Sequence, residues 1–365
     1  MNDQAYMEAA LNLAKSVHGQ TSPNPPVGAV IVKNGAIIGM GAHMKAGEAH
    51  AEVHALRMAG SNAENATIYV TLEPCSHYGK TPPCADAIIE SGIKRVVIAT
   101  KDENPKVAGE GIKKLQQANI SVELGVGKES ADELYIPFFH YAATKTPYVT
   151  VKSATSLDGK TATVTGASKW ITGEQARADV HRYRDENDAI LVGVNTVIAD
   201  DPQLTTRLSN GGGKNPTRII LDTHLRTPQK AKVVTDGEAD TWIFTGKTVP
   251  KEKLDYFSGN SGVTITQLDT DVIDINQVLK HLGREGIMTL YVEGGAAING
   301  SFLKMNKINQ LITYIAPKLI GGKDAPTSIA GQGIESIDDA LQLEVKSHEM
   351  LGDDLKIISV LREVR

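Results

Sequence analysis

The feature that most constrains the fold is a regular alternation of short apolar runs with amphipathic helical segments. In the first half, β-branched runs at 67–72, 95–100 and 121–126 alternate with segments of helical spacing. This alternation is typical of α/β proteins with a mostly parallel sheet. In such sheets the functional residues lie at the carboxyl ends of strands and the amino ends of helices. The pattern therefore predicts where a site should lie as well as the fold class.

The start of the chain adds two local predictions. Residues 3–17 have apolar positions at helical spacing and acidic residues instead of a basic leader, which indicates an amphipathic helix and not a secretory signal. Two apolar runs then flank Asn34-Gly35, a pair that readily adopts the positive φ angles of a tight hairpin turn. A further helical segment ends at Gly60, which is a typical helix stop.

Length and charge exclude several classes of protein. A chain of 365 residues usually forms two or three domains. A net charge of −5 argues against a general nucleic-acid binder. No apolar stretch approaches the roughly 20 residues that a membrane span needs. We therefore expect a cytoplasmic protein with no nucleic-acid or membrane partner, in a compartment where a structural disulfide would be unusual.

The domain boundary is expected near Lys145. There a helical segment gives way to Thr146-Pro147 and then to a new alternating strand, and a proline between elements marks a boundary. We expect domains at residues 1–144 and 145–365.

The only two cysteines stand where the fold class predicts a site. Cys75 follows a strand, and Cys84 begins a helical segment whose amino end favours thiolate over thiol. Two thiolates held close together require a cation, and His50, at the start of an earlier helix, suggests a third ligand. One His and two Cys leave the fourth tetrahedral position of zinc open, as in catalytic sites. Zinc-bound water has a pKa near 7, and Glu52 could carry its proton to a leaving amine.

Simpler interpretations remain for each of these residues. Cys75 and Cys84 could form a disulfide, or His54 or His77 could close a structural Cys₂His₂ site. Glu52 could be an ordinary surface residue. The combination of all four residues, and not any one of them, favours a catalytic metal site.

A specific resemblance strengthens this interpretation. His-x-Glu followed by Pro-Cys and a second cysteine is typical of zinc deaminases, although the usual second half is P-C-x-x-C and here eight residues intervene. The stretches TSPNPPVGAVIV, HAEVHAL and YVTLEPCSHYGKTPPC resemble the deaminase domain of the bifunctional riboflavin-biosynthesis deaminase–reductases. The resemblance implies a cytidine-deaminase-like α/β/α fold, Zn²⁺ on His50, Cys75 and Cys84, and Glu52 as the catalytic proton shuttle. It also implies substrate contacts at Asn24, His43, His77, Lys80, Asp102 and Asn104.

The second half lacks G-x-G-x-x-G, so the Rossmann fingerprint is absent. Two weaker signals for a phosphate site remain: Gly294-Gly295 before a helix, and the run LVGVNTVIADDPQLTTR. The stretches VKSATSLDGKTAT, SKWITGEQAR, LVGVNTVIADDPQLTTR and APKLIGG resemble the reductase half of the same family, whose fold is similar to dihydrofolate reductase. The match spans most of residues 147–325.

The resemblance to the reductases implies a set of contact residues. NADPH contacts are expected at Ala154, Trp170, Thr196, Asp200 and Gly295. Substrate contacts are expected at Ser168, Arg184, Leu204, Arg207 and Glu293. We add Lys152, because Lys152 and Glu293 are ionisable groups at the ends of apolar strands. Arg184 and Arg207 fit a phosphate, since a guanidinium can donate two parallel hydrogen bonds to it.

Together the two halves imply two consecutive reactions. The first is hydrolytic deamination of 2,5-diamino-6-ribosylamino-4(3H)-pyrimidinone 5′-phosphate, and the second is reduction of the ribosyl group to ribityl by NADPH. The resemblance further implies a homo-oligomer formed through the reductase half. Three rivals remain: another zinc deaminase fused to an unrelated module, a reductase with a zinc-stabilised structural domain, and a non-catalytic metal-binding interaction module.

Overall fold

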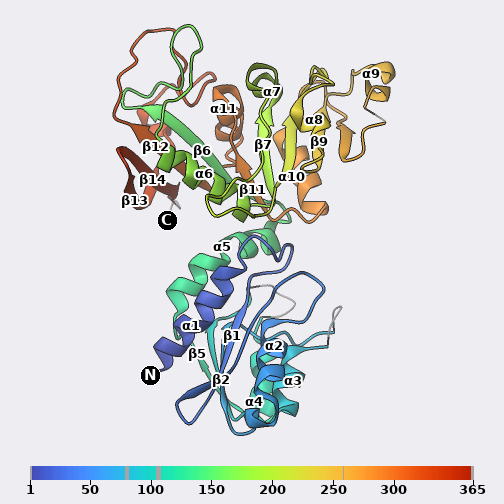
Figure 1. Cartoon of the computed structure of the whole chain (residues 1–365), viewed down its shortest axis with the longest axis vertical. Helices are drawn as coiled ribbons and strands as arrows, with labels where there is room; N and C mark the ends of the chain where they lie inside the picture. Colours follow the sequence, from blue (N-terminus) through green and yellow to red (C-terminus); the bar gives the residue numbers. More distant parts are fainter. Residues whose placement is uncertain (1, 79–81, 104–107, 258, 363–365) are drawn as a thin grey trace. The chain divides into compact units, whose positions relative to one another are not determined.

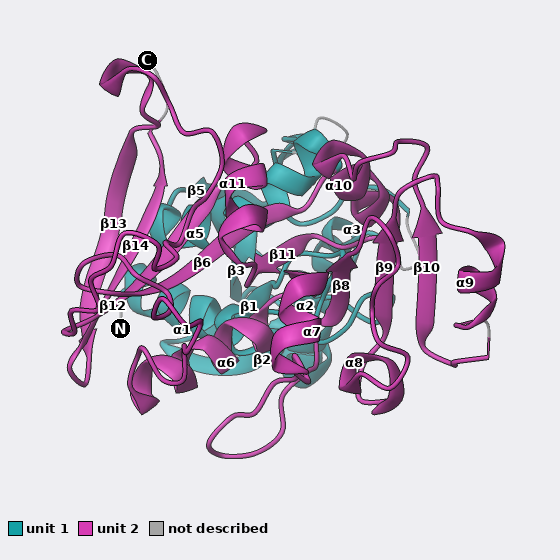
Figure 2. Cartoon of the chain, turned by 90° about the horizontal axis from the view of Figure 1, so that it is seen from above, with its two compact units in different colours: residues 1–145 teal, residues 146–365 magenta. Residues whose placement is uncertain are grey.

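The computed structural model forms two compact units, Met1–Lys145 and Thr146–Arg365, shown in different colours in Figure 2. This division lies one residue after the expected boundary. Each unit has its own sheet and its own core. No helix among the described residues is both long enough and apolar enough to cross a membrane. The described residues are 2–78, 82–103, 108–257 and 259–362.

Over its described residues the first unit has five strands and five α-helices, which can be followed in Figure 1. They are α1 (Asp3–Ser16), β1 (Gly28–Lys33), β2 (Ala36–Ala42), α2 (Ala51–Ala59), β3 (Thr67–Leu72), α3 (Cys84–Glu90), β4 (Arg95–Thr100), α4 (Glu110–Gln117), β5 (Ser121–Leu124) and α5 (Lys128–Thr144). A short 3₁₀ helix, Gly60–Ala63, follows α2.

The sheet of the first unit has the order β2-β1-β3-β4-β5. Strands β3, β4 and β5 are parallel, but β1 is antiparallel to both of its neighbours. The sheet is therefore mixed, whereas a mostly parallel sheet was expected. The predicted hairpin joins β1 to β2. Its turn residues Asn34 and Gly35 have φ angles of 53° and 79°, as a tight hairpin turn requires.

Alternating side chains bury both faces of this sheet. Ile31 and Ile68 belong to the core on the side of α2, α3 and α4, whereas Val30 and Tyr69 belong to the core on the side of α1 and α5. Successive residues of a strand point to opposite faces, and both faces are covered by apolar helix surfaces. The result is the expected three-layer α/β/α arrangement.

Glycines on β2 set the position of α2. A Cβ added at Gly41 would lie 2.2 Å from the backbone oxygen of Ala51, and one added at Gly39 would lie 2.3 Å from that of Ala55. Such distances are possible only without a side chain, so α2 lies directly against the strand. This contact fixes the amino end of α2, which begins immediately after His50.

The second unit is larger and also alternates strands with helices. Its strands are β6 (Tyr148–Ser156), β7 (Ala189–Gly193), β8 (Thr217–Leu221), β9 (Thr241–Thr245), β10 (Val263–Gln267), β11 (Thr289–Val292), β12 (Gln310–Ala316), β13 (Leu343–Leu351) and β14 (Asp354–Leu361). Its α-helices are α6 (Glu174–Glu186), α7 (Val194–Asp200), α8 (Lys232–Thr235), α9 (Lys251–Asp255), α10 (Ile275–Arg284) and α11 (Ala296–Lys304). A 3₁₀ helix covers Ile337–Asp339.

One sheet runs through this unit in the order β10-β9-β8-β7-β11-β6-β12-β14-β13. The strands from β10 to β12 are parallel, and β14 and β13 are antiparallel additions at one edge. Helices α10 and α11 pack on one face, and α6, α7 and α8 pack on the other. The sequence pattern did not predict β10, which is only partly buried, or β13, which is largely exposed.

The register of the central strands brings two ionisable residues together. Val151 of β6 lies opposite Val292 of β11 in a parallel pair. The next residues, Lys152 and Glu293, therefore lie side by side at the carboxyl end of β11, although they are far apart in sequence. A site at this edge is what the fold class predicts.

Candidate active sites

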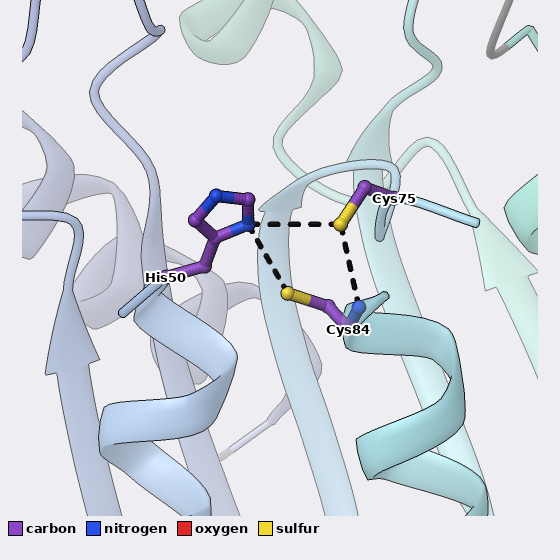
Figure 3. Close-up of side chains that lie close together, drawn as sticks. All are labelled: His50, Cys75 and Cys84. Carbon is purple, nitrogen blue, oxygen red and sulfur yellow. Dashed lines mark hydrogen bonds between the residues drawn. The ribbon is translucent and has the colours of Figure 1, made fainter. Parts of the chain in front are cut away.

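Three potential metal ligands converge at the amino ends of α2 and α3. His50 precedes α2, Cys84 is the first residue of α3, and Cys75 lies in the loop after β3 (Figure 3). The Nδ1 atom of His50 lies 3.2 Å from Sγ of Cys84 and 3.6 Å from Sγ of Cys75. All three ligand atoms lie within 4.8 Å of one another.

This donor set fits zinc. A nitrogen at 2.0–2.1 Å and a sulfur at 2.3 Å from one tetrahedral ion lie about 3.5 Å apart, close to the observed separations. Both cysteines are free, so the disulfide alternative does not hold. Among the described residues, neither His54 nor His77 joins the group. The three side chains therefore form an open site and not a closed Cys₂His₂ site.

The two thiols also have the electrostatics of metal ligands. Hydrogen bonding from Cys84 lowers the pKa of Cys75 to about 4, and the backbone N–H of Cys84 donates to the Cys75 sulfur over 3.3 Å. The same proximity, together with burial, raises the pKa of Cys84. Two adjacent thiolates repel each other, so both ionise readily only when a cation lies between them.

Glu52 lies on the first turn of α2, beside these ligands. Its side chain is only 3% exposed, and burial raises its pKa to about 7, with the neighbouring Cys75 adding to the effect. A buried carboxyl group with a pKa near neutrality can both accept and release a proton at physiological pH. This is the environment of a general acid–base residue and not of a surface glutamate.

A cavity of about 420 Å³ opens beside the three ligands. Its walls include Asn24, His43, His77 and Asp102, four of the six predicted substrate contacts. The other two, Lys80 and Asn104, lie outside the described residues.

His43 and Asn24 form a fixed pair in the cavity wall. The Nδ1–H of His43 donates to the carbonyl of Ala49 over 3.2 Å, so its Nε2 accepts from the Asn24 amide over 3.1 Å. Burial lowers the pKa of His43, which keeps the ring neutral, as this pattern needs. The arrangement leaves the amide oxygen of Asn24 available to a ligand.

Sequence reasoning missed Glu73, which lies in the same wall. Its carboxylate is 4% exposed and accepts backbone N–H groups from both ends of the segment between β4 and α4. Among the described residues the donors and distances are Asp102 (3.4 Å), Gly109 (3.0 Å), Gly111 (3.0 Å) and Ile112 (3.2 Å). No sequence signal reveals this role, because it depends on how the tertiary fold brings the segment between β4 and α4 back to Glu73.

The second unit has a separate cavity of about 490 Å³ at the carboxyl ends of β7, β8 and β11. Thr196 and Gly295, two predicted cofactor contacts, line it from the first turn of α7 and the start of α11. His224 and Arg226, which sequence reasoning missed, line it from the segment after β8. Their position after a strand of the parallel sheet was the available signal.

The predicted reductase residues Lys152, Arg184 and Glu293 form one part-buried cluster. Arg184 Nε and Nη2 donate to the two Glu293 oxygens over 2.6 and 3.1 Å, and Lys152 Nζ lies 4.0 Å from Glu293. Burial opposes ionisation of Glu293, but the charges of Arg184 and Lys152 outweigh it and lower its pKa. Burial lowers the pKa of Lys152.

Arg184, expected as a substrate contact, is already paired in this structure. Its third nitrogen, Nη1, donates to the carbonyl of Thr205 over 3.0 Å. With Glu293 on the other two nitrogens, its positive charge is already paired. Arg207, in contrast, is exposed, and its Nη1 donates to Gln203 over 3.2 Å.

The remaining predicted residues are not gathered in the 490 Å³ cavity. Trp170 is 63% exposed, with the guanidinium of Arg177 stacked 4.6 Å from its ring centre. Asp200 is exposed at the last turn of α7, and Leu204 is buried in the adjacent core. Ser168 is half-buried in the segment before α6, and Ala154 lies on β6 against another core cluster.

Family models divide the chain in the same way as the structure. Residues 1–100 match the cytidine and deoxycytidylate deaminase zinc-binding region, and residues 147–357 match the RibD C-terminal domain. Fold and site together define a zinc-binding deaminase domain joined to a reductase domain. The α/β class and the zinc site on His50, Cys75 and Cys84 are thereby confirmed.

Relatives match over nearly the whole length. The riboflavin biosynthesis protein RibD of Bacillus amyloliquefaciens is 52% identical over 361 residues, covering 99% of this chain and 97% of the relative. RibD of Escherichia coli is 42% identical over 367 residues, covering 97% and 98%. This chain belongs to the RibD family of bifunctional deaminase–reductases of riboflavin biosynthesis.

Solved structures agree with this assignment. Acinetobacter baumannii RibD superposes with a TM-score of 0.89 at 39% identity, covering 99% of both chains. A diaminohydroxyphosphoribosylaminopyrimidine deaminase/5-amino-6-(5-phosphoribosylamino)uracil reductase from Thermotoga maritima gives 0.87 at 36% identity, covering 98% of both.

Proposed function

We propose that the first unit deaminates 2,5-diamino-6-ribosylamino-4(3H)-pyrimidinone 5′-phosphate and that the second reduces the product with NADPH. The final product is 5-amino-6-(5-phosphoribitylamino)uracil. The observation that carries this proposal is the buried Glu52 beside an open His–Cys–Cys site at the wall of a cavity of about 420 Å³. A purely structural zinc site needs neither the cavity nor a buried acid.

In the first reaction the chain's residues position the base and move protons. Zinc, when bound, lowers the pKa of a coordinated water to about 7 and so supplies a nucleophile at neutral pH. Glu52 accepts one proton and delivers it to the departing amine, so that water is consumed and ammonia leaves. Asn24, held by His43, presents its amide oxygen to the ring, and His77 and Asp102 bound the same cavity.

In the second reaction the Lys152–Glu293 pair orients the sugar. NADPH, when bound, supplies a hydride to C1′ of the opened ribose. The cavity at Thr196 and Gly295 supports cofactor binding, because backbone N–H groups at helix amino ends favour phosphates. The substrate contacts at Ser168, Arg184, Leu204 and Arg207, and the cofactor contacts at Ala154, Trp170 and Asp200, form part of the proposal.

The test is a paired assay with the diaminopyrimidinone ribosyl phosphate, in which ammonia release is followed with and without NADPH. Wild-type protein should release ammonia without NADPH and consume NADPH when it is added. Glu52→Gln should stop ammonia release, yet still consume NADPH when deaminated substrate is supplied. If Glu52→Gln releases ammonia normally, Glu52 is not the proton shuttle. If wild-type protein releases none, the zinc site is structural.

Arg226 is a candidate for the residue that distinguishes NADPH from NADH. This exposed arginine lines the 490 Å³ cavity, and its Nη2 donates to the amide oxygen of Asn195 over 2.8 Å. Arginine binds phosphate by parallel hydrogen bonds, and the 2′-phosphate is what distinguishes the two cofactors. Arg226→Ala should raise KM for NADPH about tenfold and leave KM for NADH unchanged; equal changes in both would exclude this role.

A homo-oligomer formed through the second unit is also part of the proposal. Among the described strands β13 is a sheet edge that pairs with β14 alone, and all but its last residue are exposed, including Val345 and Met350. An edge strand of this length readily pairs with another chain. Val345→Lys should convert the oligomer to a monomer in light scattering.

We place the protein in the cytoplasm, because the zinc-binding thiols must stay reduced.

A further inference from the structure

Buried hydrogen bonds link α5 and β3 to the segment where β1 begins. The backbone N–H of Gly28 donates to Oγ1 of Thr71 over 3.0 Å. Oγ1 of Thr71 lies 2.6 Å from the hydroxyl of Tyr135, and that hydroxyl donates to the carbonyl of Pro26 over 3.0 Å. Thr71 and Tyr135 are both 0% exposed. The hydrogen bonds therefore leave the segment at Gly28 and return to it at Pro26.

The carbonyl at one end fixes the direction of every hydrogen bond. A carbonyl oxygen only accepts, so the single proton of the Tyr135 hydroxyl must point to Pro26. Thr71 consequently donates to the Tyr135 oxygen while it accepts from Gly28. Burial raises the pKa of Tyr135, so the phenol keeps the proton that this order needs. Removing either hydroxyl leaves its two neighbours buried without their partner.

The same segment forms part of the wall of the deaminase cavity. The carbonyl of Val27 accepts the backbone N–H of His43 over 2.9 Å, and the ring of His43 holds the amide of Asn24 over 3.1 Å. Asn24 precedes Pro26 by two residues. Asn24, Val27 and His43 all line the cavity of about 420 Å³. The position of Asn24 in the cavity therefore depends on a backbone that the two buried hydroxyls fix.

We propose that the Tyr135 hydroxyl is a positioning residue for deamination, which acts through the backbone at Pro26 to hold Asn24 against the pyrimidine ring. The hydroxyl does not touch the substrate. This inference rests on the proposed function, because it assumes that Asn24 binds the ring. It explains why a hydroxyl is buried in the apolar core between α1, α5 and the sheet, where a phenylalanine would fill the same space.

The test combines one substitution with a matched control and a second background. Tyr135→Phe removes the hydroxyl and keeps the ring. Tyr6→Phe is the control, because Tyr6 belongs to the same core and its hydroxyl also donates to a backbone carbonyl, that of Gly35 in the β1–β2 turn, over 2.8 Å. For each variant kcat/KM for ammonia release is measured in the wild-type and in the Asn24→Ala background. If Tyr135 acts through Asn24, the effect of Tyr135→Phe disappears once Asn24 has been removed.

Tyr135→Phe should lower kcat/KM about tenfold in the wild-type background, which corresponds to about 1.4 kcal/mol. In the Asn24→Ala background its effect should be less than about twofold, and Tyr6→Phe should have less than about a twofold effect in both backgrounds. The inference is overturned if Tyr135→Phe costs the same factor in both backgrounds. It is also overturned if Tyr135→Phe costs no more than Tyr6→Phe.

Thr71 gives a second test that does not depend on the folding of Tyr135→Phe. Thr71→Val removes the hydroxyl and keeps the shape of the side chain, so it should lower kcat/KM as Tyr135→Phe does. Thr71→Ser keeps the hydroxyl and should stay within about twofold of wild type. Equal losses for the two variants overturn the inference. A wild-type protein that releases no ammonia, or an Asn24→Ala variant with the wild-type kcat/KM, would instead refute the proposed function or its Asn24 contact, and this inference with it.

Discussion

Glu73→Gln should destabilise the first unit strongly, although the change replaces only one oxygen by an NH₂ group. Oε1 of Glu73 accepts the N–H groups of Gly111 and Ile112, and Oε2 accepts those of Asp102 and Gly109. Glutamine keeps one acceptor and turns an NH₂ group toward two N–H donors. A hydrogen bond to a charged group contributes about 1.5–3 kcal/mol. Glutamine should therefore lose two of these hydrogen bonds, and a small rotation of its amide limits the loss. The free energy of unfolding should fall by about 3 kcal/mol.

The assay is thermal inactivation of ammonia release. For a domain of this size, 1 kcal/mol shifts the midpoint by about 3 °C, so Glu73→Gln should lower it by about 9 °C. Glu123→Gln is the matched control, because Glu123 lies on the same sheet in a half-exposed ion pair with Arg95. Exposed pairs contribute about 0–1 kcal/mol, so its shift should stay below about 3 °C. Equal shifts for both variants would refute the reasoning.

Other regions of the structure give three further predictions. Gly41→Ala places a Cβ 2.2 Å from a backbone oxygen of α2 and should weaken zinc retention at least tenfold in chelator competition; unchanged retention would contradict the close packing. Hydrogen bonds from Arg95 lower the pKa of Asp3 from 3.8 to about 2, so its contribution is present above about pH 4 and is lost as pH falls through 2. Asp3→Asn should therefore cost less than about 1 kcal/mol at pH 7 and only a small fraction of that at pH 2 in urea unfolding, and a pH-independent difference would exclude the ion pair as the cause. Glu293→Leu removes the counter-charge of Arg184 and should lower the free energy of unfolding of the second unit by about 3 kcal/mol. An unchanged midpoint of thermal inactivation, measured by NADPH consumption, would show that the ion pair does not stabilise this unit.

Local patterns predicted most of the first unit. The Asn34-Gly35 turn depends only on two backbone conformations, so it could be recognised from sequence. The zinc ligands could be recognised because each sits at a strand or helix end, where the fold class concentrates function. The exposed strand β13 was not predicted, because strands are recognised by their buried residues and those of β13 are almost all exposed.

Non-local pairings could not be predicted. The ion pair of Arg184 with Glu293 joins α6 to the segment after β11, and nothing near either residue indicates the other. The sequence therefore suggested a phosphate contact for Arg184, or a solvated charge on a helix, and not the pairing with Glu293. The same limit hid Glu73, whose partners are backbone groups of a distant loop.

The order of strands in the second unit has a consequence for its synthesis. Strand β6 is made first but lies between β11 and β12, so that Tyr148 pairs with Thr289 and Val151 with Leu311. Both edges of this apolar strand stay unpaired on the ribosome until β11 and β12 have been made, whereas the β1–β2 hairpin can form at once. Substitutions that delay the pairing of β6 should therefore reduce the yield of folded chain even where the finished protein is equally stable.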